Sequence, residues 1–107
     1  MKAAAEVSVI LREFSGDAKA AELLVDEQYS DLRIESVSQL YSLQAARINA
    51  YRVRMVEVRE WRLITCVDHF NRVIGLLAVM PRSDDYEKNT TLWKRIERDY
   101  DADFRRY

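Results

Sequence analysis

Cysteine, histidine, proline and glycine are all scarce in this chain, which has 107 residues but only one cysteine, one histidine, one proline and two glycines. The single cysteine, Cys66, cannot form an internal disulfide and has no second cysteine beside it for a zinc site, so we expect a buried structural thiol. No carboxylate and histidine spacing is typical of a metal site, and no glycine-rich phosphate loop is present. We therefore expect neither a metal nor a cofactor.

Long apolar runs are also lacking. No run approaches the roughly 20 residues needed to cross a bilayer. The start MKAAAEVSVI has no sustained apolar region of the kind found in signal peptides. We expect a cytoplasmic protein with no membrane partner. With 49% hydrophobic residues and few breaks in the chain, residues 1–107 are predicted to form a single domain.

Charge is unevenly distributed although the formal net charge is only −1. Residues 1–46 carry four basic and eight acidic side chains, whereas residues 47–82 carry seven arginines and three acidic side chains. A basic stretch on an otherwise acidic domain is typical of a site for an anion or an acidic partner. The alternative is that these arginines only solvate the outer face of an antiparallel sheet.

The first half of the chain predicts one strand and two helices. Residues 7–11, VSVIL, are typical of a short strand, and the turn at residues 15–17 precedes an apolar helical face formed by Ala21, Leu24 and Val25. A second helix is predicted from Ser36 to residue 47, because apolar residues recur there at nearly helical spacing.

In the second half of the chain, the spacing of apolar residues changes from helical to strand-like. Residues 51–55 alternate apolar side chains with arginines, residues 61–67 are rich in β-branched and aromatic residues, and residues 73–80 are apolar throughout. The last of these is predicted to be a central strand covered on both faces and ended by Pro81. Residues 68–71, which include the only histidine, His69, are predicted to form a hairpin loop, so we do not expect His69 to reach the site. A C-terminal helix is predicted from residue 90.

The predicted fold is therefore α+β, in the order β-α-α-β-β-β-α, with a mostly antiparallel sheet, two N-terminal helices on one face and a C-terminal helix. If the three strands of the second half pair as a meander, five side chains converge on one end or face of the sheet: Arg52, Arg54, Arg62, Arg82 and Tyr86.

Four motifs occur in a fixed order in the second half of the chain: Tyr51-Arg52-Val53-Arg54, Trp61-Arg62-Leu63-Ile64, the apolar run from Arg72 to Val79, and Arg82-Ser83-Asp84-Asp85-Tyr86. Together with the element order, they resemble the RelE/ParE superfamily of toxins from bacterial type II toxin-antitoxin systems. The resemblance covers roughly residues 6–90 and is greater to the RelE-like mRNA interferase branch, because of the basic and tyrosine-containing tail.

This resemblance implies a ribosome-dependent endoribonuclease that cuts mRNA without a metal, by attack of the ribose 2′-oxygen on the adjacent phosphate. By motif position, Arg62 and Arg82 are the candidate phosphate-binding residues, and Tyr86 is the third candidate catalytic residue. Tyr86 could orient the 2′-oxygen, stack on a base or act as the base. Arg52 and Arg54, with Lys88, are candidate RNA-binding residues. A fork-shaped guanidinium suits this task because it can hold two phosphate oxygens at once.

Other interpretations remain open. Arg62 could cap a sheet edge, Tyr86 could cover the core, and Trp61 and Trp93 are more typical of core residues than of base-stacking platforms. In the ParE branch the same fold inhibits DNA gyrase, and a domain that has lost toxicity could persist as a binding module. The expected partners are the ribosome with its mRNA and a cognate antitoxin whose acidic or amphipathic segment wraps the domain over the arginines of residues 47–82.

Overall fold

A computed structural model describes residues 2–15, 21–68, 73–82, 88 and 90–104. The elements follow in the order α1 (Lys2–Ser15), the 3₁₀ helix η1 (Leu23–Val25), β1 (Ile34–Gln39), α3 (Tyr41–Ala45), β2 (Ala50–Met55), β3 (Trp61–Asp68), β4 (Val73–Pro81) and α4 (Thr90–Asp103). The strands form one antiparallel sheet in the order β1-β2-β3-β4. The predicted α+β class, the meander of the last three strands and the C-terminal helix are therefore confirmed.

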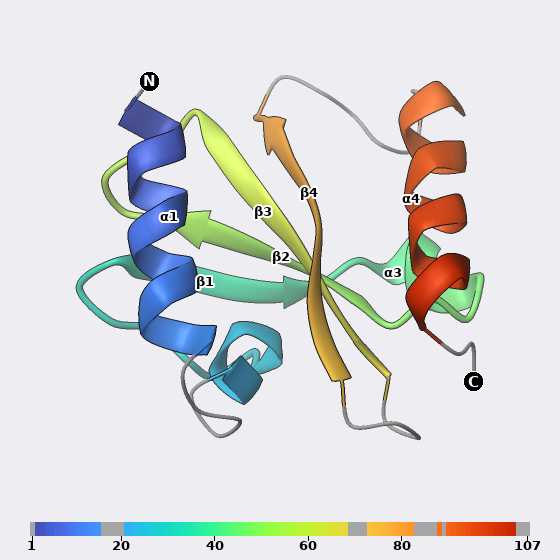
Figure 1. Cartoon of the computed structure of the whole chain (residues 1–107), viewed down its shortest axis with the longest axis horizontal. Helices are drawn as coiled ribbons and strands as arrows, with labels where there is room; N and C mark the ends of the chain where they lie inside the picture. The colour runs from blue at the N-terminus through green and yellow to red at the C-terminus, as the bar shows by residue number, and fades with distance from the viewer. Residues whose placement is uncertain (1, 16–20, 69–72, 83–87, 89, 105–107) are drawn as a thin grey trace.

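Two apolar cores lie on the two faces of this sheet, and Figure 1 shows α1 and α4 on opposite sides of it. One core joins α1 and η1 to inward-facing residues of the first three strands, with Ile10, Ile34 and Val53 fully buried. The other joins α3 and α4 to the opposite face, with Leu43 and Tyr100 fully buried. Because both faces are covered, polar side chains on the sheet have few places to reach solvent.

Residues 7–11 are part of helix α1, so the strand predicted there is wrong. Val7, Ile10 and Phe14 are buried on the helix face that meets the sheet. Their spacing of three and four residues is helical, but it extends beyond the short VSVIL window on which the strand prediction rested. A short apolar run cannot by itself distinguish a strand from a buried helix segment.

The helix predicted from Ser36 to residue 47 is only partly correct. Residues 34–39 form β1 instead, and only Tyr41–Ala45 are helical. This short helix packs against the α4 side of the sheet. The prediction that the two N-terminal helices pack on one face is therefore wrong. The helix predicted after residue 17 is reduced, within the described residues, to a short helical segment that ends in η1.

Strand β4 lies at the edge of the sheet and not at its centre, which corrects a second prediction. Its apolar character has a different origin: α4 covers one face, whereas Leu76 and Val79 on the other are 38% and 39% exposed. Cys66 is buried in β3, as predicted, and its thiol lies 3.7 Å from the carbonyl oxygen of Gly75.

A turn at residues 31–33 ties α1 to the sheet. The carboxylate of Asp31 accepts hydrogen bonds from the backbone N–H groups of Arg33 and Ile34 at 2.8 and 2.7 Å, and from the Tyr29 hydroxyl. The guanidinium of Arg33 reaches the carboxylates of Glu6 and Glu13 on α1 at 3.0 and 3.2 Å. No helix within the described ranges is long and apolar enough to cross a membrane.

Candidate arginine site

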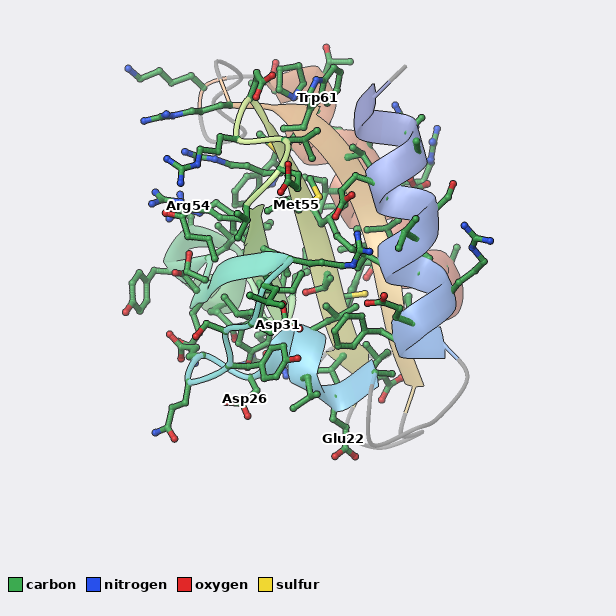
Figure 2. The ribbon with its side chains drawn as sticks, turned by 90° about the vertical axis from the view of Figure 1, so that its left-hand side faces the viewer. Glu22, Asp26, Asp31, Arg54, Met55 and Trp61 are labelled. Carbon is green, nitrogen blue, oxygen red and sulfur yellow. The ribbon has the colours of Figure 1, made fainter. Side chains whose placement is uncertain are left out.

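Strands β2 and β3 bring three of the predicted arginines onto one face of the sheet. Arg54 and Arg62 are direct partners across the ladder, and Arg52 lies two residues before Arg54. Because side chains alternate between the faces of a strand, all three project to the same side. In Figure 2 Arg54 points away from the face covered by α1. Three of the five side chains that were predicted to converge, those of Arg52, Arg54 and Arg62, therefore share one face of the sheet.

A polar cavity of about 120 Å³ lies at this end of the sheet. Its lining combines four arginines with one glutamate and one methionine: Arg54, Arg59, Arg62, Arg82, Glu35 and Met55. Arg82 reaches it from the end of β4, where its backbone N–H donates to the carbonyl of Glu60 at 2.6 Å. Counted over the described residues, four guanidinium groups against one carboxylate give the lining a formal charge of +3.

Arg59 and Glu35 were not among the residues predicted from the sequence. Arg59 lies in the turn between β2 and β3, and the buried Val58 beside it fixes that turn to the core. The sequence did contain a signal for Arg59: a turn between the two paired strands must lie at the same end of the sheet as Pro81 and Arg82. Glu35 has no such signal.

Glu35 lies at an irregularity in β1. Ile34 pairs with Met55 and Ser36 pairs with Arg54, so Glu35 is an extra residue in the ladder. A bulge of this kind re-aims side chains and is frequent beside active sites. Here it places Glu35 and Ser36 together opposite Arg54, and Glu35 lines the cavity.

The electrostatics of the cavity favour an anion. Burial lowers the pKa of Arg62, and the neighbouring charges of Arg52, Arg54 and Arg82 lower it further. The Nε atom of Arg54 is buried without a hydrogen-bond partner. Within the described part of the chain, no carboxylate forms an ion pair with any of the four lining arginines. A bound anion would therefore relieve repulsion and supply missing acceptors.

The predicted site residues fall into three groups. Arg54, Arg62 and Arg82 line the cavity, whereas Arg52 lies beside it on the same sheet face and does not line it. Lys88 is exposed and is not part of the lining. Tyr86 lies outside the described residues, as does His69.

The side chains present suit phosphate binding. A guanidinium can donate two parallel hydrogen bonds to a phosphate, and the Glu35 carboxylate can accept a proton. Across the ranges that the structure covers, no group of three or more histidine, cysteine or acidic side chains could hold a metal ion.

Comparison with known proteins shows no match to a protein-family model, to a curated protein or to a solved structure. The similarity to RelE/ParE toxins therefore depends on the sequence motifs alone.

Proposed function

We propose that this protein is the toxin of a type II toxin-antitoxin system, a RelE-like endoribonuclease that cuts mRNA on the ribosome without a metal. The observation that carries this proposal is the cavity in which four arginines surround one carboxylate. Metal-free cleavage of RNA needs cations to hold the charge of a phosphorane and a group to take the 2′-proton. Both kinds of group line this cavity.

The arginines stabilise the transition state in this proposal. Arg62 and Arg82 hold the non-bridging oxygens of the scissile phosphate, and Arg54 neutralises the charge that accumulates as the phosphorane forms. Paired strands and a hydrogen-bonded strand end set the backbone positions of these three residues before the substrate arrives. Donors that are already oriented cost no reorganisation energy at the moment of reaction, which is why such groups are effective.

Glu35 is the proton acceptor in this scheme. The 2′-oxygen loses its proton to the Glu35 carboxylate and forms a bond to phosphorus, and the bond from phosphorus to the 5′-oxygen breaks. The products are a 2′,3′-cyclic phosphate and a 5′-hydroxyl, the leaving oxygen taking its proton from water. Tyr86, the sequence-based candidate for this role, is then left to orient the 2′-oxygen or to stack on a base.

The antitoxin is the second partner in this proposal. The described residues of the cavity lining carry a formal charge of +3, which attracts an acidic segment as well as RNA. An antitoxin that lays carboxylates over Arg54, Arg59 and Arg62 would both neutralise their repulsion and exclude the substrate. Inhibition and substrate binding would then compete for the same charges.

Inducible expression in bacteria tests the proposal. We expect growth arrest with an early loss of methionine incorporation and with mRNA cut inside open reading frames. Arg62→Ala and Arg82→Ala should each relieve toxicity, because one preorganised cation contributes on the order of a hundredfold in rate. Arg12→Ala is the matched control, since Arg12 is an exposed arginine of α1, which packs on the opposite face of the sheet.

Two results would contradict the proposal. An early loss of DNA synthesis with an SOS response would indicate a ParE-like gyrase inhibitor. Full toxicity of both cavity variants, with thermal unfolding like that of the wild type, would show that the arginine cavity is not the active site.

A further inference from the structure

A second depression adjoins the arginine cavity. It has a volume of about 600 Å³ and is lined by Arg59, Glu60, Trp61, Pro81 and Arg82. Arg59 and Arg82 line both spaces, so these two side chains form the boundary between them. The volume falls within the range of about 300–1,000 Å³ that is typical of small-molecule sites.

The apolar part of this depression is held by the sheet. Trp61 begins β3 and is the direct cross-strand partner of Pro81 at the end of β4. The Trp61 backbone N–H donates to the Val58 carbonyl at 3.1 Å, and Val58 is buried. Trp61 is itself half-buried, because it packs against the α1 side of the core and also lines the depression. The two rings therefore have fixed positions beside the cavity.

We propose that Trp61 and Pro81 form a nucleobase subsite for single-stranded RNA, next to the phosphate site. This proposal rests on the proposed function and deepens it. A nucleotide whose phosphate occupies the arginine cavity must place its base within a few ångströms, and the depression across Arg59 and Arg82 is the adjoining space. The flat face of the indole and the apolar proline ring beside it, flanked by guanidinium planes, suit a base of any identity.

The lining of this depression combines charged side chains with two apolar rings, and the rings suit a base better than an ion. Trp61 and Pro81 present rings that cannot hold a phosphate, whereas base stacking on an aromatic ring strengthens binding by roughly tenfold to a hundredfold. Glu60 also lines the depression and can accept hydrogen bonds from the amino groups of a base. The subsite would therefore position the nucleotide and contribute to base preference.

Tryptophan fluorescence can test this inference directly, because the chain has only two tryptophans. Trp93 lies on α4 and packs against the core on the other face of the sheet, so Trp93→Phe leaves Trp61 as the sole reporter. The probes are a 2′-deoxy-blocked RNA trinucleotide, the same trinucleotide with its bases removed, and inorganic phosphate. We expect quenching by the base-bearing probe, and little or none by the abasic probe or by phosphate.

Affinity measurements on three variants complete the test. Trp61→Phe should keep most of the affinity for the base-bearing trinucleotide, and Trp61→Leu should weaken it roughly tenfold with little change for the abasic probe. Leucine retains apolar volume, and thermal unfolding checks that each variant folds. Tyr41→Leu is the control for loss of an exposed aromatic ring, because Tyr41 is 76% exposed on α3 and does not line the depression.

The outcomes separate the two proposals. If Trp61→Leu binds the base-bearing probe as well as Trp61→Phe does, while Arg62→Ala binds it poorly, the nucleobase subsite is wrong and the arginine site stands. If the base-bearing and abasic probes bind the wild type equally, the same conclusion follows. If neither trinucleotide nor phosphate binds the wild type, the nucleobase subsite and the phosphate site in the arginine cavity are both wrong.

Discussion

Arg54 and Arg62 face each other directly across the β2–β3 ladder, on a sheet that is covered by helices on both faces. Like charges in opposed positions destabilise a sheet. Here the effect is increased by burial, which is the main reason why the pKa of Arg62 is lowered. Such an arrangement costs stability, and a bound negative charge would relieve that cost, as in the trade between stability and function that binding sites commonly show.

The first prediction is that removing the charge of Arg62 stabilises the free protein. Arg62→Met keeps the apolar stem and removes both the desolvation cost and the repulsion from Arg54. We expect a gain on the order of 0.5 kcal/mol in the free energy of unfolding at low ionic strength. The gain should shrink in about 1 M salt, where charges are screened within roughly 3 Å. Urea denaturation at both salt concentrations measures it.

Arg12→Met is the control for this prediction, because Arg12 is exposed on α1, the helix that packs on the other side of the sheet. It should show no comparable gain. A loss of stability in Arg62→Met at both salt concentrations would mean that the guanidinium makes favourable contacts that outweigh its repulsion.

The second prediction concerns Glu35. If Glu35 takes the 2′-proton, Glu35→Gln should lower the cleavage rate by about a hundredfold or more, since a positioned base contributes roughly 10²–10⁴-fold. Its affinity for phosphate should not fall, because the substitution removes a negative charge from the cavity lining, where Glu35 is the only acidic residue among those that the structure describes. Single-turnover cleavage and phosphate titration separate these two effects. Unchanged cleavage in Glu35→Gln would return the base role to Tyr86.

The strands that carry the site could be predicted from the sequence, because the alternation of arginines with apolar residues in 51–55 is a local signal. The pairing of Arg54 with Arg62 follows from the short turn between their strands. Arg59 could have been found in the same way, as a residue of that turn. These features depend on neighbours in the chain.

Features that depend on the three-dimensional arrangement could not be predicted. Glu35 enters the cavity only because β1 contains an extra residue opposite Arg54, and nothing in its local sequence marks a bulge. The edge position of β4 depends on strand order, which an apolar run does not specify. The N-terminal helix was missed because its apolar face extends from Val7 to Phe14, beyond a short window rich in β-branched residues.

The third prediction is acid destabilisation through Asp31. Burial alone would raise the pKa of Asp31, but hydrogen bonds from Tyr29 and from the backbone N–H groups of Ile34 and Arg33 lower it overall. A carboxyl group with a lowered folded-state pKa adds stability above its unfolded pKa of about 3.9, and this stability is lost as the pH falls through the folded value. Asp31→Asn should therefore be less stable than the wild type at pH 7, with a difference that narrows below pH of about 4.

The contact between Tyr29 and Asp31 also makes stability depend on pH in the alkaline range, where stability falls as the pH rises. The hydrogen bond that Tyr29 donates to Asp31 is the main reason why the pKa of Tyr29 is raised to about 12. The neutral phenol therefore stabilises the fold below its unfolded pKa of about 10, and this contribution disappears as the pH rises towards 12. Tyr29→Phe lacks that dependence, so wild type and variant should converge above pH of about 10. Parallel stability curves for the two proteins would contradict this assignment.

The last prediction tests how α4 is fixed to the sheet. Gly75 lies in β4 beneath the ring of Phe104, and a methyl group at Gly75 would overlap that ring. Phe104 also stacks on the buried Tyr100, with ring centroids 5.3 Å apart. Gly75→Ala should push the ring away and destabilise the protein by about 1–3 kcal/mol, the usual cost of overpacking.

In the double variant Gly75→Ala with Phe104→Leu, the smaller side chain leaves room for the methyl group. Its stability should then equal that of Phe104→Leu alone or exceed it slightly, because alanine loses less conformational entropy than glycine on folding. Thermal unfolding of the four proteins forms a complete cycle, and additive effects of the two substitutions would show that Gly75 and Phe104 are not in contact.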